Sequence, residues 1–148
     1  MINLVCDANI RQAAEVHAIS WRESHRGICS EAFIAVHTTE RQMGYLQSQM
    51  DKGADVYLLY DGTRPVGIVS LLGEMIGDLY VLPDEQGRGF GTELLHFAME
   101  KCEGTPTLWV LNSNRRAMKL YERLGFRATG ERHVLSETLS EIEMLYSE

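Results

Sequence analysis

The 148-residue sequence contains only three cysteines, Cys6, Cys29 and Cys102, and they stand far apart. An odd number of scattered cysteines provides neither a disulfide framework nor the paired spacing of a zinc site. The five histidines show no ligand spacing either, so we expect no metal centre. Three reduced thiols are the usual state in the cytoplasm, which is the expected location of this protein.

Long apolar segments are absent as well. No hydrophobic run approaches the ~18 residues that a transmembrane helix requires. The first residues, Met1 to Asp7, lack the basic start and the apolar stretch of a secretory signal. Positive charge is scarce, because 14 Lys and Arg residues stand against 21 Asp and Glu residues, for a net charge of −7. This balance argues against nucleic acid or an anionic membrane as a partner and favours a cationic ligand.

Repeats, low-complexity stretches and linkers are absent too, so residues 1–148 are expected to form one domain. Hydrophobic residues make up 45% of the sequence and charged residues 24%, which is the composition of an ordinary globular protein. A chain of this length buries roughly two thirds of the surface that it exposes when unfolded. The sequence therefore predicts a folded domain with a real core.

The hydrophobic pattern predicts helices in the first third of the chain and mainly strands after it. A helix capped by Asp7 should end at Gly27, and a second should begin at Thr38 and end at Gly53. Strands are expected at residues 56–60, 65–72, 76–82, 107–111, 126–134 and 139–146. Two further helices lie among them, one opened by a glycine-rich segment and one capped by Asn114. This order indicates a mixed α/β sheet.

The glycine-rich segment, Gln86-Gly87-Arg88-Gly89-Phe90-Gly91, is the most informative part of the sequence. It joins a predicted strand to a predicted helix, and the first N–H groups of a helix have no intrahelical acceptor. Together with the helix dipole these groups bind anions. The glycines let a bulky phosphate approach the backbone, and the side chains of Gln86 and Arg88 are further donors. We therefore expect a diphosphate ligand.

Two common phosphate-binding motifs do not match this segment. A Walker loop requires Gly-Lys-Ser/Thr, whereas the sequence has Gly91-Thr92-Glu93. A dinucleotide fingerprint requires G-x-G-x-x-G in the first strand–helix unit, whereas these glycines are spaced G-x-G-x-G beyond the middle of the chain. A third motif fits: the segment resembles the Q/R-x-x-G-x-G/A coenzyme A loop of the GNAT superfamily of N-acetyltransferases.

Two other segments carry the same resemblance. The family pattern N-x-x-A-x-x-x-Y-x-x-x-G-F follows the loop at the proper distance, at Asn114, Ala117, Tyr121, Gly125 and Phe126. Residues 20–27 are similar to the first helix and loop of many small members. The resemblance covers nearly the whole chain. It implies the GNAT fold, a central mixed and mostly antiparallel twisted sheet with a splayed parallel strand pair, flanked by helices.

The resemblance also implies which residues bind acetyl-CoA as the cosubstrate. The backbone of the strand before the loop would pair with the pantetheine arm, at Leu79, Tyr80 and Val81. The amides of the loop would bind the pyrophosphate, at Gln86, Gly87, Arg88, Gly89, Phe90, Gly91 and Thr92. Asn114 would contact the cosubstrate from the next strand–helix junction. Tyr121 matches the tyrosine that commonly protonates the leaving thiolate.

The chemistry of a phenol suits that task, because a group of pKa ~10 can donate a proton or hydrogen bond to a thiolate whose conjugate acid has a pKa near ~8.5. The alternative is that Tyr121 is only a core residue on an apolar helix stripe. Asn114 is also explained as a helix cap. Arg115 and Arg116 are either a solvated face or contacts to the 3′-phosphate. Trp21 either packs in the core or lines the acceptor site.

The sequence leaves the general base open. Many relatives have a glutamate on one of two strands, at places where this chain has Ile76 and Trp109. The remaining candidates are Asp78, Glu74, Glu23 and His25, or a chain of water molecules.

The expected acceptor is a primary amine, first of a small cationic molecule and second of a protein N-terminus or lysine. The residues expected to bind it are Trp21, Glu23 and His25. Direct transfer in a ternary complex is expected, because no cysteine lies in a reactive setting. A non-catalytic acyl-CoA-binding or regulatory module is the alternative: the missing strand glutamates favour it and Tyr121 counts against it. Homodimers are common among the proteins that the sequence resembles, which leaves a homodimer open.

Overall fold

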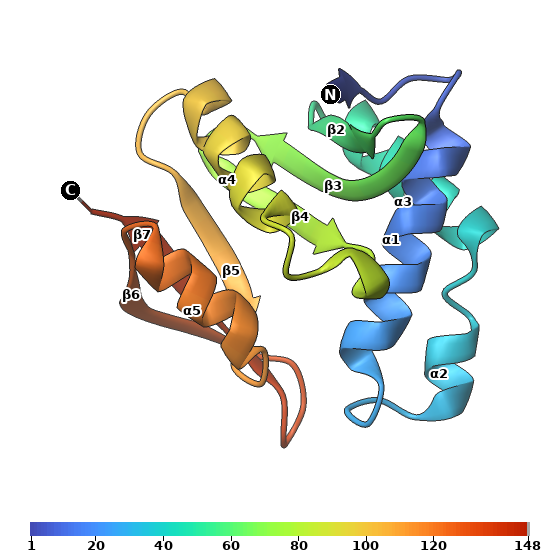
Figure 1. The fold of residues 1–148 in the computed structure, drawn as a ribbon. Coiled ribbons are helices and arrows are strands. Elements are labelled where there is room, and N and C mark those ends of the chain that lie inside the picture. The colour runs from blue at the N-terminus through green and yellow to red at the C-terminus, as the bar shows by residue number, and fades with distance from the viewer. Residues whose placement is uncertain (148) are drawn as a thin grey trace.

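A seven-stranded sheet lies at the centre of the protein, in the order β1-β2-β3-β4-β5-β7-β6 (Figure 1). The computed structural model describes residues 1–147. The strands are β1 Ile2–Leu4, β2 Asp55–Asp61, β3 Arg64–Leu72, β4 Met75–Val81, β5 Thr107–Leu111, β6 Phe126–Val134 and β7 Ser140–Tyr146. The helices are α1 Ile10–His25, α2 Glu31–Ala35, α3 Thr39–Asp51, α4 Phe90–Lys101 and α5 Arg115–Arg123, with a 3-10 turn at Pro83–Glu85.

One neighbouring pair in this sheet, β4 and β5, is parallel, and the other pairs are antiparallel. The parallel pairing extends over only two residue pairs, Met75 with Thr107 and Ile76 with Leu108. Beyond them β4 and β5 diverge, so that the sheet opens toward the C-terminal ends of both strands (Figure 1). The predicted fold, with its splayed parallel pair and flanking helices, is therefore confirmed.

Helices cover both faces of the sheet. On one face, Ala13 of α1 and Leu46 of α3 pack with Ile68 in a buried apolar cluster. On the opposite face, Leu94 of α4 and Tyr121 of α5 belong to a second buried cluster. Because α1 and α4 flank β3 and β4 from opposite sides, the C-terminal end of α1 and the N-terminal end of α4 both reach the splay. No helix among residues 1–147 has the length and apolar composition needed to cross a membrane.

The structure differs from the expectation at the N-terminal end. Residues Ile2–Leu4 form β1, which pairs with β2, and a three-residue strand is too short to show an alternating pattern. The predicted cap at Asp7 is wrong, because α1 begins at Ile10 and the residue before it is Asn9. The side-chain oxygen of Asn9 accepts the Cys6 amide at 2.8 Å, which turns the chain into the helix. The segment at 30–36 contains the short helix α2.

Candidate active site

The splay between β4 and β5 contains two adjoining cavities. The loop cavity, of about 680 Å³, lies between β4, the glycine-rich loop and α5. The aromatic cavity, of about 520 Å³, lies between α1, α3, β4, β5 and the β6–β7 hairpin. The residues that line both cavities are Ser24, Leu79, Tyr80, Asn114 and Tyr121. A group bound in one cavity can therefore meet a group bound in the other at these residues.

The N-terminus of α4 presents free amides to the loop cavity. Gly89 precedes the helix and has a φ of 87°, a left-handed conformation that glycine adopts without strain. The amide of Glu93 donates to the carbonyl of Gly89 at 3.0 Å. Because this is the first bond of the helix, the amides from Gly89 to Thr92 have no intrahelical acceptor. With the helix dipole they can hold a phosphate, as the sequence predicts.

Most residues that the sequence assigns to acetyl-CoA line the loop cavity. They are Leu79, Tyr80, Val81, Gln86, Gly87, Gly89, Phe90, Gly91, Thr92 and Asn114. Arg88 does not line it, because its guanidinium lies 3.1 Å from the Asp61 carboxylate and also contacts Glu85. The Arg88 side chain therefore ties the loop to the end of β2, and only its backbone remains available to a ligand.

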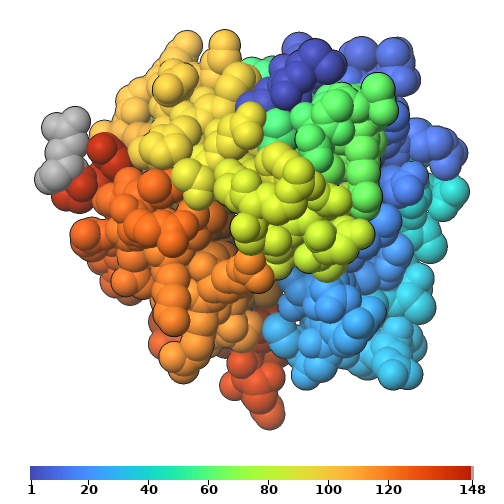
Figure 2. Space-filling model, viewed as in Figure 1, coloured from blue at the N-terminus to red at the C-terminus, as the bar shows by residue number. Residues whose placement is uncertain are grey.

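Basic side chains of α5 line the other side of the loop cavity. Arg116, Lys119 and Arg123 are spaced at i, i+3 and i+7, which places them on one face of the helix. Arg115 is next to them in sequence and does not line the cavity. Sequence reasoning considered Arg116 and missed Lys119 and Arg123, although their helical spacing was a usable signal. Figure 2 shows α5, the glycine-rich loop and the end of α1 meeting on one face of the molecule.

The free edge of β4 faces the splay. The amide of Leu82 donates to the carbonyl of Val66 on β3 at 2.9 Å. Because backbone groups alternate in direction along a strand, those of Leu79 and Val81 point away from β3, toward the diverging β5. The carbonyl of Val81 already accepts from the Gln86 side chain, at 3.3 Å. An extended polar chain can pair with this edge as an additional strand would.

Tyr121 belongs both to the buried apolar cluster and to the lining of both cavities. Its ring is 7% exposed and packs edge to face with Phe126, at a centroid distance of 6.1 Å. Tyr121 lines both cavities, and its hydroxyl makes no hydrogen bond within residues 1–147. Burial raises the pKa of Tyr121, so the phenol remains protonated at neutral pH and can act as a donor. The core role and the catalytic role considered from sequence are therefore compatible.

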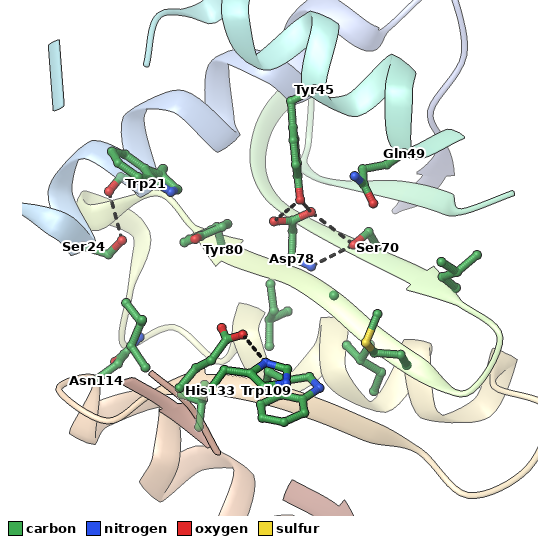
Figure 3. Close-up of a pocket in the computed structure, with 18 of the residues that line it drawn as sticks. Trp21, Ser24, Tyr45, Gln49, Ser70, Asp78, Tyr80, Trp109, Asn114 and His133 are labelled. Carbon is green, nitrogen blue, oxygen red and sulfur yellow. Dashed lines mark hydrogen bonds and ion pairs between the residues drawn. The ribbon is translucent and has the colours of Figure 1, made fainter. Parts of the chain in front are cut away.

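Asp78 places a carboxylate in the aromatic cavity. It accepts hydrogen bonds from the Tyr45 hydroxyl at 3.0 Å, from the Ser70 hydroxyl at 3.3 Å, and from the buried ring of His17 at 3.1 Å. Figure 3 shows Tyr45 and Asp78 pointing toward one another on one wall. Gln42 fixes the other ring nitrogen of His17, at 2.7 Å. Three side-chain donors from α1, α3 and β3 thus converge on the Asp78 carboxylate and fix its position in the cavity.

The other site residues that the sequence suggests do not all lie in the same cavity. Trp21 and His25 line the aromatic cavity, where their rings stack at a centroid distance of 3.8 Å. Glu23 lies in the loop cavity and forms a 2.8 Å ion pair with Arg26. Glu74 lines neither cavity. The structure therefore brings Trp21 and His25 together in the aromatic cavity and leaves Glu23 and Glu74 outside it.

Sequence reasoning missed a second wall of the aromatic cavity. There the ring of His133 on β6 stacks on the ring of Trp109 on β5, with centroids 3.9 Å apart and planes at 11° (Figure 3). The Nδ1 atom of His133 lies 3.2 Å from a carboxylate oxygen of Glu141, its partner residue on β7. The three residues belong to three strands, and no local sequence pattern shows how those strands pair.

Comparison with protein families agrees with this geometry. Residues 15–146 match the model of the acetyltransferase (GNAT) domain. The chain belongs to the GNAT family. The predictions of the family, of an acetyltransferase and of acetyl-CoA as its cosubstrate are confirmed by this match.

Two kinds of curated GNAT-family relatives are similar over part of their length. The peptidyl-lysine N-acetyltransferase YjaB of Salmonella typhimurium is 35% identical over 74 residues, which are 50% of this chain and 50% of YjaB. The mycothiol acetyltransferase of Rhodococcus jostii is 41% identical over 58 residues, which are 34% of this chain and 19% of that protein. The chain thus spans half the length, or less, of these relatives.

Solved structures are similar over the whole chain. The PaiA N-acetyltransferase of Thermoplasma acidophilum, in complex with coenzyme A, has a TM-score of 0.76 at 16% identity and covers 100% of this chain and 98% of its own. The apo form of YjaB from Escherichia coli has a TM-score of 0.71 at 20% identity and covers 99% and 96%. At these identities the likeness shows the fold.

Proposed function

We propose that this GNAT protein transfers the acetyl group of acetyl-CoA directly to the primary amine of a small cationic molecule. The charge of the aromatic cavity supports a cationic acceptor. Asp78 and Glu141 line it, and the described residues around it include neither Lys nor Arg. Opposite charges attract more strongly where water is partly excluded, so this cavity favours an ammonium group over a carboxylate.

The loop cavity suits the other substrate. In the proposal, the α4 amides and the basic face of α5 hold the phosphates, while Leu79 and Val81 hold the extended arm. The thioester then lies at the residues shared by the two cavities, where a bound amine can attack its carbonyl carbon. The sulfur leaves with negative charge, and Tyr121 supplies a proton to it. Burial supports this role, because it keeps the Tyr121 hydroxyl protonated.

A lysine side chain of a protein is the second candidate acceptor. The local similarity to YjaB, which is named a peptidyl-lysine N-acetyltransferase, favours it. A module that binds acyl-CoA without turnover is the third reading. The cytoplasmic location and a homodimer stay predictions.

Two assays on the purified chain separate these readings. The first measures the shift of melting temperature with acetyl-CoA, and the second measures release of free thiol with spermidine, glucosamine, a lysine-containing peptide and glutamate. The proposal expects stabilisation and the fastest turnover with spermidine or glucosamine. Fastest turnover with the peptide would favour the second candidate. Stabilisation without turnover across the panel would leave only the binding module.

A further inference from the structure

His133 lies on the wall of the aromatic cavity opposite Asp78 (Figure 3). It forms a dyad with Glu141, which lines the same cavity. A carboxylate has no proton to donate, so the contact of 3.2 Å places a proton on Nδ1 of His133. In the neutral ring the other nitrogen, Nε2, then carries the lone pair. A histidine that is oriented in this way, with a carboxylate behind it, is ready to accept a proton.

We propose that His133 is the general base that deprotonates the acceptor amine, and that Glu141 is its positioning residue. This inference rests on the proposed direct transfer to an amine. The strand positions at which many relatives have a glutamate hold Ile76 and Trp109 in this chain, and neither side chain can accept a proton. In the proposal His133 takes the role of the missing base.

The surroundings of His133 stabilise the imidazolium that the reaction would form. Glu141 supplies a negative charge at Nδ1. The indole of Trp109 lies flat against the ring, at a centroid distance of 3.9 Å, and the face of an indole attracts a cation. The His133 side chain is 59% exposed, so the proton can pass to water after each turnover.

The rival imidazole, His25, also stacks on an indole, that of Trp21 at a centroid distance of 3.8 Å, but it has no carboxylate partner among the described residues. Its Nδ1 donates to the backbone carbonyl of Trp21 at 2.8 Å, and that carbonyl carries no formal charge. Burial lowers the pKa of His25 by more than the hydrogen bond to the Trp21 carbonyl raises it, and the nearby His37 and His17 lower it further. The environment of His25 therefore disfavours the protonated ring that a base must become.

Other titratable groups face His133 across the aromatic cavity. They are Asp78 and Tyr80 of β4, Tyr45 of α3, His25 of α1 and Tyr121 of α5. The Asp78 carboxylate is held by three donors, the Tyr45 and Ser70 hydroxyls and the His17 ring. Burial raises the pKa of each of these tyrosines, so they stay neutral while an imidazole titrates. His133 is thus the cavity residue whose protonated form has a charged partner.

The proton transfers balance over one turnover. The ammonium group gives one proton to Nε2 of His133 and becomes a neutral amine, whose nitrogen forms the bond to the thioester carbon. The carbon–sulfur bond breaks, and the thiolate takes the proton of Tyr121. The new amide nitrogen returns its surplus proton to the Tyr121 phenolate, while His133 releases its proton to water. The products are the acetylated amine, free coenzyme A and one proton.

The variant His133→Phe tests the base, because it keeps a flat ring against Trp109 and removes both nitrogens. With the panel amine that turns over fastest, we expect kcat to fall by about 10²–10⁴-fold, with little change in the affinity for acetyl-CoA. The acidic limb of the pH profile of kcat/KM should disappear. The matched control is His96→Phe, which removes an exposed imidazole of α4 outside both cavities. It should leave kcat and the limb unchanged.

Four further variants test the positioning role of Glu141, the base itself and the rival imidazole His25. Glu141→Gln should lower kcat less than His133→Phe does, and Glu141→Asp should restore part of the loss. Added imidazole should raise the kcat of His133→Ala, because removal of the ring leaves space against Trp109. Retention of the acidic limb in His133→Phe, together with its loss in His25→Phe, would overturn the proposal.

Turnover by the wild-type protein distinguishes a failure of the proposed direct transfer from a failure of His133 as the base. If the wild type turns over a panel amine and His133→Phe does so equally well, only the assignment of the base is wrong. If the wild type turns over none, both the direct transfer and the base are wrong.

Discussion

Ser70 contacts Asp78 twice across the β3–β4 pair. The Ser70 hydroxyl oxygen accepts the Asp78 amide at 2.7 Å, and the hydroxyl donates to the Asp78 carboxylate at 3.3 Å. The two residues Gly77 and Asp78 lie opposite the single residue Ser70, which makes a β-bulge. A Cβ on Gly77 would lie only 2.5 Å from the Ser70 oxygen, so this tight arrangement requires glycine. The bulge determines from which face of the sheet the Asp78 side chain projects.

The first prediction concerns the glycine-rich loop. Gly89 lines the loop cavity and a Cβ there would meet no protein atom within 4 Å, while a φ of 87° strains a β-branched residue. Gly89→Val should therefore weaken acetyl-CoA binding severely, as measured by calorimetry. Gly62→Val is the matched control, because Gly62 also has a positive φ and open space but lies outside both cavities. Equal affinity in both variants would contradict the loop assignment.

The second prediction concerns Tyr121. Tyr121→Phe keeps the ring in the apolar cluster, so the melting temperature should stay close to that of the wild type. The hydroxyl acts only as the carbon–sulfur bond breaks, so kcat should fall by about 10²–10⁴-fold while the affinity for acetyl-CoA stays nearly constant. A kcat within about threefold of the wild type, in an assay limited by the chemical step, would remove Tyr121 from the mechanism.

The third prediction separates two neighbouring cations. Lys119 lines the loop cavity and Arg115 does not. A charged hydrogen bond contributes about 1.5–3 kcal/mol, so Lys119→Ala should raise the KM for acetyl-CoA roughly tenfold or more, and added salt should reduce the difference. Arg115→Ala should leave this KM unchanged. Steady-state kinetics at two ionic strengths check both, and equal effects of the two variants would contradict the proposed phosphate site.

The fourth prediction concerns stability and pH. Trp21 lies between His25 and His37, with ring centroids 3.8 and 3.6 Å away. Burial lowers the pKa of both histidines from the ordinary 6.5. The unfolded chain therefore binds more protons than the folded one, so stability is full above this value and falls as the pH drops below it.

Melting curves between pH 7.5 and pH 5 measure this loss. His37→Phe keeps an aromatic ring beside Trp21 but cannot titrate, so its melting temperature should fall less over the same range. A fall as large as that of the wild type would show that these rings do not carry the pH dependence.

The bulge explains why the sequence could not place Asp78. In a regular strand Ile76, Asp78 and Tyr80 would share one face of the sheet. In the structure Ile76 packs in the cluster beneath α4, whereas Tyr80 packs in the cluster beneath α1 and α3. The extra residue at Gly77 shifts the alternation of side chains by one position. A pattern with a period of two therefore assigns the residues on one side of the bulge to the wrong face of the sheet. A glycine inside a strand is compatible with a bulge, but the sequence alone does not show that one forms at Gly77.

The loop and α5 were easier to predict, because their chemistry depends on neighbours in sequence. Gly89 requires a left-handed backbone, and Asn114 caps α5 by accepting the Ala117 amide at 3.2 Å, and both follow from residue type and position. The wall of Trp109, His133 and Glu141 depends instead on how β5, β6 and β7 pair. Residues brought together by strand pairing leave no local signal, which is why that wall was missed.

The backbone pairing between β4 and β5 is brief, so few hydrogen bonds connect the two parts of the sheet, although one apolar cluster spans both. Strands β1 to β4 form one part of the sheet and β5 to β7 form the other. Backbone pairing joins the two parts only at Met75–Thr107 and Ile76–Leu108. A ligand that forms hydrogen bonds with Leu79 and Val81 of β4 and also contacts α5 adds a second connection between the two parts of the sheet. Cosubstrate occupancy should therefore stiffen the domain as a whole, and slower amide exchange at Leu79 and Val81 would report that stiffening first.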